Sequence, residues 1–179
     1  MVKSNLKTIF TLAVIALLGI GTFSCQKEEE KEKKDNKPVN YGDYVDLGLP
    51  SGTLWKSKNE LNPKDTAYNL YTFDEAVAAF GDKVPTQEQM NELIKQCTCT
   101  WDGNGYNVVG PNGNSIYLPG VGIRYCDGTY GAMGKEGLYW SSTKYLGGGY
   151  YLYFLANTGV YIHSHNTCNA GSIRLVKKK

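Results

Sequence analysis

The sequence predicts an α+β domain in which two short helices pack on a twisted, mostly antiparallel sheet with long loops. Two segments have apolar residues at helical spacing, and each begins with a capping box, at Thr72 and at Thr86. From Trp101 onward the chain is rich in Tyr, Val and Ile, and short apolar runs alternate with turns rich in Gly and Asn. Helices followed by strands favour segregated α and β regions over repeated βαβ units.

Residues 1–24 have the pattern of an export signal. Lys3 and Lys7 precede an apolar run from Ile9 to Ile20, which is too short to span a bilayer comfortably and lacks the polar face of a buried helix. The segment ends at Cys25, and Thr22 to Cys25 resembles a bacterial lipobox with Thr22 where Leu is usual. We therefore expect a lipoprotein signal peptide and a lipid attached to Cys25, which metabolic labelling with palmitate would detect.

Residues 25–40 predict a tether between the lipid and the domain. The charge run from Glu28 to Lys37 is typical of a solvated, disordered segment. Gln26 to Glu30 resembles the acidic export signal of Bacteroidetes lipoproteins, which directs them to the outer face of the outer membrane. We expect the outer membrane to be a partner through the lipid anchor, with the domain facing the cell exterior.

Residues 41–179 are long enough for one domain with one core. This segment has 12 Lys and Arg residues and 12 Asp and Glu residues, and only Lys177 to Lys179 cluster. Nucleic-acid binding requires a basic face, so this composition argues against it.

Four cysteines remain in the domain, and they allow three disulfide pairings. Cys97 and Cys99 are separated by one residue, whereas zinc ligands usually have two or more residues between them, so a disulfide or buried thiols are favoured over a metal. We expect Cys126 and Cys168 to form a disulfide, because both are in loops next to strands and an exported chain permits the bond.

The first elements are a strand–turn–strand unit and the two helices. Tyr44 to Trp55 contains a Gly-Pro-Ser-Gly turn signal, with Trp55 as a core residue. The first helix begins after Thr72 and ends at Gly81, and the second follows Thr86. Their expected buried stripes are Phe73, Ala76, Val77 and Phe80 in the first helix, and Met90, Leu93, Ile94 and Cys97 in the second.

The β region is organised around one expected central strand, Leu138 to Thr143. Its alternation predicts that Tyr139 or Trp140 enters the core while hydroxyl groups occupy the other face. The flanking segments are a hairpin at Asn112-Gly113, a Gly-rich loop from Cys126 to Gly137 and a flexible turn at Gly147 to Gly149. The other expected extended segments are Tyr106–Val109, Ser115–Leu118, Pro119–Tyr125, Tyr150–Leu155, Val160–His165 and Ser172–Val176.

Five phrases resemble, in content and order, the Fibrobacter succinogenes major paralogous domain (FISUMP) of Bacteroidetes surface lipoproteins. They are Val45 to Trp55, Val84 to Thr86, Gly110 to Pro119, Tyr139 to Thr143 and Ser172 to Val176. The resemblance covers nearly the whole domain and implies a C-type-lectin-like fold, but it brings no known activity. The carboxylate triplets of calcium-dependent lectins are missing, and Gly110-Pro111-Asn112 lacks the acid, so we expect recognition without calcium and without any cofactor.

No residue pattern requires catalysis. His163 and His165 share one side of a strand but lack a third ligand in the sequence pattern, so we expect solvent-facing histidines and no metal site. Ser141 and Ser142 lack the Gly-x-Ser-x-Gly elbow of a nucleophilic serine. The acids are scattered, and several lie in the first turns of helices, where the helix dipole accounts for them. The sequence therefore predicts a protein that is not an enzyme.

All 14 tyrosines lie in the domain, together with many Asn and Gly residues, which is typical of adaptable binding loops. An equally good interpretation is that the tyrosines simply border a sheet. If a binding face exists, we expect it on the loops 101–104, 127–135 and 145–150, with the candidate residues Trp101, Asn104, Tyr130, Tyr145 and Tyr150. The predicted function is a non-enzymatic recognition or adhesion module for a glycan or protein ligand. The alternative is a structural or assembly component of the cell envelope or fimbriae.

Overall fold

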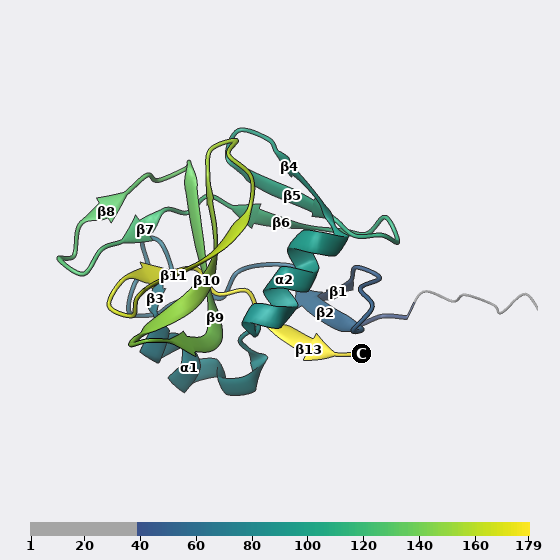
Figure 1. Cartoon of the computed structure of the whole chain (residues 1–179), viewed down its shortest axis with the longest axis horizontal. Coiled ribbons are helices and arrows are strands. Elements are labelled where there is room, and N and C mark those ends of the chain that lie inside the picture. The colour runs from purple at the N-terminus through teal and green to yellow at the C-terminus, as the bar shows by residue number, and fades with distance from the viewer. Residues whose placement is uncertain (1–38) are drawn as a thin grey trace, which may run out of the picture. The chain divides into compact units, whose positions relative to one another are not determined.

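The computed structural model describes residues 39–179 (Figure 1). The expected signal peptide, Cys25 and the tether up to residue 38 lie outside the described residues. Within residues 39–179, none of the helices has both the length and the apolarity needed to cross a bilayer. The prediction of an α+β domain with a mostly antiparallel arrangement is confirmed: every pairing between named strands is antiparallel.

The strand–turn–strand unit forms as predicted. Strands β1 (Tyr44–Asp46) and β2 (Thr53–Lys56) pair antiparallel, and Trp55 is fully buried. Strand β13 (Val176–Lys178) pairs with the other edge of β2. The predicted closing strand at Ser172 to Val176 begins later than expected. Ser172 forms only an isolated bridge with Tyr139, residues 173–175 belong to no strand, and the ladder begins at Val176.

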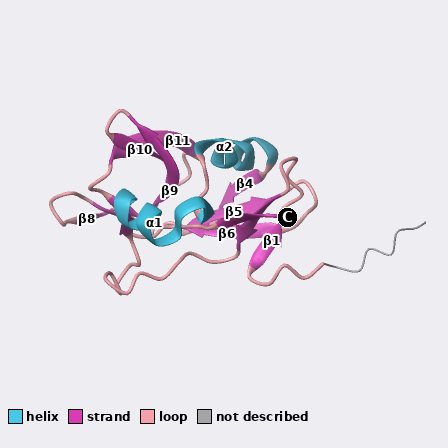
Figure 2. Ribbon diagram, turned by 90° about the horizontal axis from the view of Figure 1, so that it is seen from below, coloured by secondary structure: helices cyan, strands magenta, loops and turns pink. Residues whose placement is uncertain are grey.

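Both helices form with the predicted capping boxes. Helix α1 (Phe73–Phe80) is capped by Thr72, is stopped at Gly81 and continues into the short 3₁₀ turn η1 (Gly81–Lys83). Helix α2 (Gln87–Gln96) is capped by Thr86, and its Met90 and Leu93 are buried. The helices occupy different places in the domain, with α1 beside β9 and α2 beside β11 (Figure 2).

The first hairpin sheet contains a strand that the sequence analysis missed. Strand β4 (Thr98–Trp101) pairs with β5 (Gly105–Val109), which pairs with β6 (Ser115–Pro119) across the predicted Asn-Gly turn. Alternate β4 residues face the core, so Cys99 and Trp101 are half-buried and the two threonines are exposed. Cys97 caps the end of α2, and Cys97 and Cys99 are both free thiols.

The predicted Gly-rich loop is more ordered than expected. Strand β8 (Tyr130–Gly131) lies within this loop and pairs with β7 (Ile123–Arg124), which precedes the loop. Strand β7 also pairs with β12 (Ala170–Gly171), and β12 in turn pairs with β3 (Tyr71–Thr72). The last two residues of the predicted loop, Glu136 and Gly137, belong to strand β9.

Strand β9 (Glu136–Tyr145) pairs with β10 (Gly148–Leu155), which pairs with β11 (Tyr161–Asn166). Gly148 and Gly149 belong to strand β10 and do not form the expected flexible turn. The lack of a side chain at Gly149 allows the Phe73 ring of α1 to pack directly against the strand. A Cβ atom on Gly149 would lie 2.3 Å from that ring. Strand β9 is the edge of its own sheet, but its other edge meets Ser172, whose N–H donates to the Leu138 carbonyl at 2.7 Å.

Strand β9 separates two hydrophobic cores, so the expected polar face is wrong. Tyr139 enters one core and Trp140 enters the other, and both are buried. The Ser141 hydroxyl is also buried and donates to the Tyr150 carbonyl at 2.9 Å. The first core comprises Leu47, Leu49, Trp55, Met90, Leu93, Tyr106, Val108, Ile116, Leu118, Tyr139, Leu152, Phe154 and Val176. The second comprises Tyr71, Phe73, Ala76, Val84, Ile123, Leu138, Trp140, Tyr151, Ile173 and Leu175.

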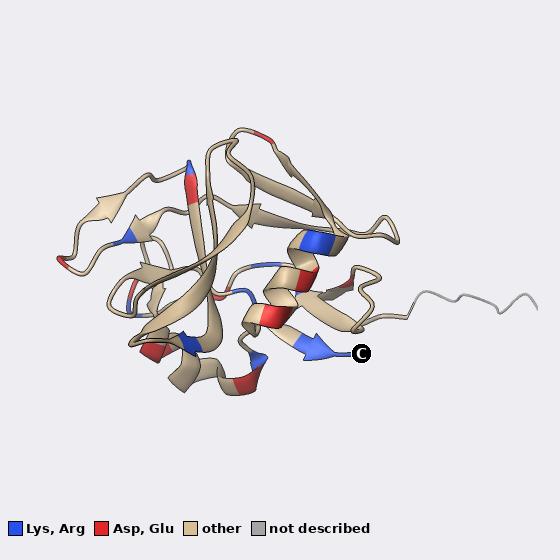
Figure 3. Cartoon of the chain, viewed as in Figure 1, with Lys and Arg blue, Asp and Glu red and all other residues tan. Residues whose placement is uncertain are grey.

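The basic C-terminal residues contact the N-terminal part of the domain (β13 is blue in Figure 3). The Lys177 ammonium donates to the Tyr41 carbonyl at 3.1 Å and lies 4.5 Å from the centre of the Tyr44 ring. Lys179 forms an ion pair with Asp46 at 2.7 Å. Two of the three clustered lysines therefore have partners within the domain itself.

Candidate functional site

The structure does not bring the five sequence-predicted ligand residues together. Trp101 contributes to the first core, where its ring packs 5.4 Å from Tyr106 and 6.0 Å from Phe154. Asn104 is exposed in the β4–β5 loop, and its carbonyl accepts from the Gly120 N–H at 2.7 Å. Tyr130 lies in β8, 43% exposed, with its ring 4.8 Å from Tyr68.

Tyr145 and Tyr150 form a separate pair, with ring centroids 5.1 Å apart, at the β9–β10 turn. The first residue of β9, Glu136, lies near the β4–β5 loop, because Gly120 contacts both Asn104 and Glu136. The last residue of β9 is Tyr145, and a ten-residue strand is about 30 Å long. Figure 1 shows the β9–β10 turn far from the β4–β5 loop.

A denser group of aromatic side chains lies on β10 and β11. The antiparallel register places Tyr151 opposite His163, Tyr153 opposite Tyr161 and Gly149 opposite His165. Since residues two apart on a strand share a face, these five side chains form one row, which we call the tyrosine–histidine face. Its members are Tyr151, Tyr153, Tyr161, His163 and His165.

The rings of the tyrosine–histidine face are close enough for aromatic interactions with one another. The Tyr151 ring lies 6.3 Å from both His163 and His165, and Tyr153 lies 5.8 Å from His163. Tyr151 is buried against the second core, Tyr153 is half-buried, and Tyr161 is 47% exposed. The two imidazoles are exposed. The rings on β11 are therefore accessible to a ligand, and they pack against the more buried tyrosine rings on β10.

A pocket of about 370 Å³ adjoins the His165 end of this face. Its lining has no Asp, Glu, Lys or Arg and consists of Tyr145, Leu146, Gly147, Gly148, Ser164, His165 and Asn166. One sequence-predicted ligand residue, Tyr145, therefore lies next to the tyrosine–histidine face.

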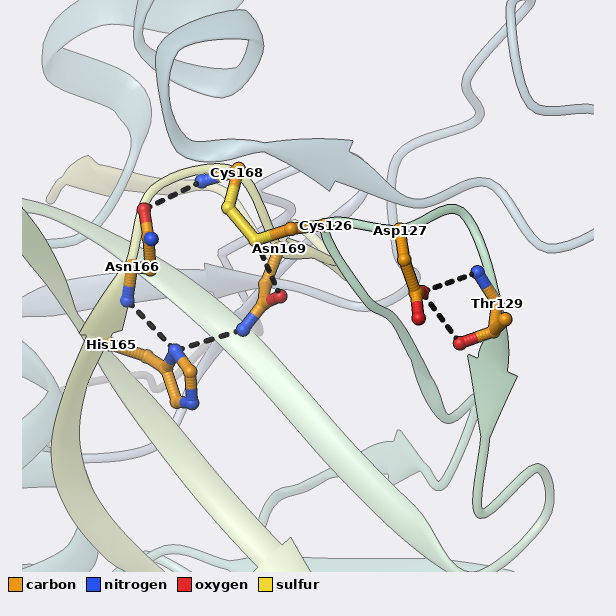
Figure 4. The surroundings of a disulfide bond; sticks show 7 residues. All are labelled: Cys126, Asp127, Thr129, His165, Asn166, Cys168 and Asn169. Carbon is orange, nitrogen blue, oxygen red and sulfur yellow. Dashed lines mark hydrogen bonds between the residues drawn. A yellow bond between two sulfur atoms is a disulfide. The ribbon is translucent and has the colours of Figure 1, made fainter.

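The hydrogen bonds of His165 fix its tautomer. The Asn166 backbone N–H can only donate, and it points to Nδ1 of His165 at 2.8 Å; the Asn169 side chain also meets this atom at 2.8 Å (Figure 4). In the uncharged form of the ring the proton is therefore on Nε2, which makes Nε2 a hydrogen-bond donor in this arrangement. Residues 39–179 also contain no group of three or more His, Cys, Asp or Glu side chains suited to a metal ion.

The predicted disulfide between Cys126 and Cys168 is confirmed, with a Cα–Cα separation of 5.0 Å (Figure 4). Asn169 follows Cys168, is almost fully buried and places its Oδ1 atom 3.2 Å from the Cys126 sulfur. The bond thus joins the β7–β8 hairpin to the segment that orients His165.

Glu136 occupies the opposite end of the tyrosine–histidine face. It is only 7% exposed, and burial raises the pKa of its carboxyl group, while the nearby Tyr153 hydroxyl opposes this shift as a hydrogen-bond donor. Burial, followed by the charge of Glu136, raises the pKa of Tyr153 to about 12, so its hydroxyl is protonated at neutral pH. Burial likewise raises the pKa of Tyr151.

Sequence reasoning missed most of this face because it concentrated on loops. The available signal was the spacing of two residues: Tyr151 and Tyr153 on one strand, and Tyr161, His163 and His165 on the next. Two such rows, joined by a short turn, share one side of a hairpin when the register pairs them, as it does here. Glu136 gave no such signal, because it lay at the end of an expected loop.

A second, largely apolar pocket of about 580 Å³ lies along α1. Its lining also has three charged residues, and it consists of Asn62, Pro63, Lys64, Tyr71, Asp74, Glu75, Ala78 and Ala79. Its Tyr71 hydroxyl donates to the Leu61 carbonyl, so this group is already bound within the domain.

Comparison with known proteins gives no relative: no protein-family model matches the chain, and no curated protein and no solved structure is significantly similar to it.

Proposed function

We propose that this protein is a surface-exposed lipoprotein whose domain recognises a glycan at the tyrosine–histidine face, without catalysis and without calcium. The observation that supports this proposal most directly is the row of rings on β10 and β11, of which those on β11 are exposed. The row continues into a pocket whose lining has no Asp, Glu, Lys or Arg.

Glycans fit the chemistry of this face. Aromatic rings present large apolar surfaces at a low entropic cost, and their faces suit the C–H surfaces of sugar rings. The ring N–H of His165 and the side chains of Ser164 and Asn166 can hydrogen-bond to sugar hydroxyl groups. The rigid hairpin holds these groups in place before binding, which lowers the entropic cost of association.

The cellular setting proposed here depends on the sequence. The signal peptide, the lipobox and the acidic tether support attachment through Cys25 and display outside the outer membrane. The order of two helices followed by strands supports the C-type-lectin-like FISUMP assignment that the five phrases suggest.

The test is binding of the purified full-length lipoprotein in detergent to an array of glycans and host-matrix proteins. Replacing Tyr161 and His163 together with Ala should weaken glycan binding at least about tenfold, because both rings are exposed at the face. Tyr68→Ala is the matched control, since it removes an exposed ring near Tyr130 instead.

Three other results would contradict the proposal. If Tyr68→Ala abolishes binding and the double variant does not, the ligand binds at the Tyr130 hairpin. Binding to proteins but to no glycan would show that the ligand is a protein and not a glycan. Binding to nothing, together with co-purification of an envelope protein under mild crosslinking, would favour a structural or assembly role.

A further inference from the structure

Glu136 lies on the same side of the sheet as the tyrosine–histidine face. It pairs in register with Leu155 of β10, and Leu138, two residues further along β9, pairs with Tyr153. Leu138 and Trp140 face the second core, as does Tyr151. Because residues two apart share a face, the Glu136 side chain is a diagonal neighbour of Tyr153.

The Glu136 carboxyl group is buried without a cationic partner. Neither of the two ion pairs in residues 39–179 involves it, and the adjacent Lys135 is exposed. Burying a carboxylate is unfavourable unless a charge or several hydrogen bonds compensate. The Tyr153 hydroxyl gives only partial compensation, since the pKa of Glu136 remains raised.

The groups around Glu136 are aromatic. The Tyr153 ring lies 6.0 Å from the Tyr151 ring, and both tyrosines respond to the charge of Glu136. Tyr125, next to the β7–β8 hairpin, also lies near Tyr153 and is 42% exposed. A carboxylate with aromatic neighbours is suited to an ammonium group, which can pair with the carboxylate and contact ring faces.

We propose that Glu136, with Tyr151 and Tyr153 beside it and Tyr125 next to Tyr153, binds the protonated amine of an unacetylated amino sugar in the glycan that occupies the tyrosine–histidine face. This inference rests on the proposed function and adds the ligand chemistry. An amino sugar is favoured over a lysine-bearing protein because the rest of the face offers rings and hydrogen-bonding groups but no further carboxylate, which matches a hydroxylated chain with few amines.

The experiment compares glucosamine oligomers with N-acetylglucosamine oligomers of equal length, titrated calorimetrically into the full-length lipoprotein at pH 6. Acetylation removes the charge of the amine and leaves the ring unchanged. The wild-type protein should bind the free-amine oligomer roughly tenfold or more tightly, as expected for a hydrogen bond between charged groups. Glu136→Gln should reduce this ratio to near one, with little change in binding of the acetylated oligomer.

Two further variants guard against indirect effects. Glu88→Gln, an exposed acid in the first turn of α2, should leave the ratio unchanged. Tyr125→Ala removes one exposed aromatic neighbour without touching either core and should lower the ratio while unfolding behaviour stays normal.

The outcomes separate this inference from the proposed function. If neither oligomer nor any other glycan binds, the proposed function fails. If glycans bind at the tyrosine–histidine face but the wild-type protein shows no preference for the free amine, only the present inference fails. Glu136-dependent binding of a lysine-rich peptide without binding of the glucosamine oligomer would overturn the choice of an amino sugar.

Discussion

The Asn59 side-chain oxygen accepts two hydrogen bonds from the buried guanidinium of Arg174, at 2.9 Å from Nε and 2.6 Å from Nη2. The remaining N–H groups of Arg174 donate to the backbone carbonyls of Lys56, Ser57 and Tyr117. Arg174 is 2% exposed, and all of its hydrogen-bond partners are uncharged oxygens. This one side chain therefore joins the segment after β2, strand β6 and the C-terminal segment.

We predict that Arg174→Lys lowers the free energy of unfolding by about 3–5 kcal/mol, since a lysine ammonium cannot match the planar fork of five donors and leaves buried acceptors unpaired. Urea unfolding followed by tryptophan fluorescence measures the change. Lys178→Met is the matched control, because Lys178 is an exposed cation on β13, and it should change stability little. An Arg174→Lys protein as stable as the wild type would mean that the carbonyl network contributes nothing.

Gly137 and Phe154 are paired in register, and a Cβ atom on Gly137 would lie 2.2 Å from the Phe154 ring. We predict that Gly137→Ala destabilises the domain by about 1–3 kcal/mol through overpacking. Phe154→Leu should also destabilise, but the double variant should be more stable than the sum of the two effects, because the smaller side chain makes room for the methyl group. Strict additivity in the unfolding free energies would show that the two sites do not interact.

The Cys126–Cys168 disulfide closes a loop with a sequence separation of 42. Chain-entropy arguments assign to such a loop about 4 kcal/mol of stabilisation as an upper estimate. Replacing both cysteines with Ser should therefore lower the urea midpoint strongly, and a reductant should do the same to the wild type. Cys97→Ala is the control, because that thiol is free: the substitution alone should change the midpoint much less, and a reductant should lower the midpoint of this variant as much as that of the wild type. An unchanged midpoint after complete reduction would contradict the prediction.

Local sequence signals predicted most of the elements. The boxes at Thr72 and Thr86 and the Asn112-Gly113 turn determine their structure within a few residues, so these predictions are confirmed. Longer-range packing decides the rest. Gly149 is a strand residue because Phe73, distant in sequence, fills the space above it. From the sequence, Trp101 is expected to be an exposed loop residue, but the pairing of β4 with β5 directs its ring toward the first core, where it packs against Phe154.

The candidate site was only partly predictable for the same reason. Tyr145 lies at the pocket next to the tyrosine–histidine face, and the sequence identified it through the composition of its turn. Tyr151 and His163 come together only through the β10–β11 register, which the sequence pattern allows but does not specify. The role of Glu136 depends on its burial, and burial at the end of a Gly-rich segment has no local signal.

The last prediction concerns pH and Glu136. Its folded-state pKa is raised by burial, so the native state holds this proton more tightly than the unfolded state, and stability rises as pH falls from neutral through that pKa. The folded-state pKa of Asp46 is lowered, first by its hydrogen bond with Lys179, so its contribution is present above the unfolded pKa and is lost on further acidification. Wild-type stability should therefore pass through a maximum on the acidic side of neutrality.

Glu136→Gln removes the first of these two effects. The variant should be more stable than the wild type at pH 7, because the raised folded-state pKa of Glu136 lowers wild-type stability above the unfolded-state pKa. The difference should shrink toward about pH 4, below the unfolded-state pKa. Urea unfolding of both proteins between pH 4 and 7 measures this convergence, with Glu88→Gln as the exposed control. A difference that is independent of pH would show that the pKa of Glu136 is the same in the folded and unfolded states, which would contradict the prediction. Convergence, combined with loss of amine preference in the same variant, would mean that the domain keeps a destabilising charge because its ligand requires it.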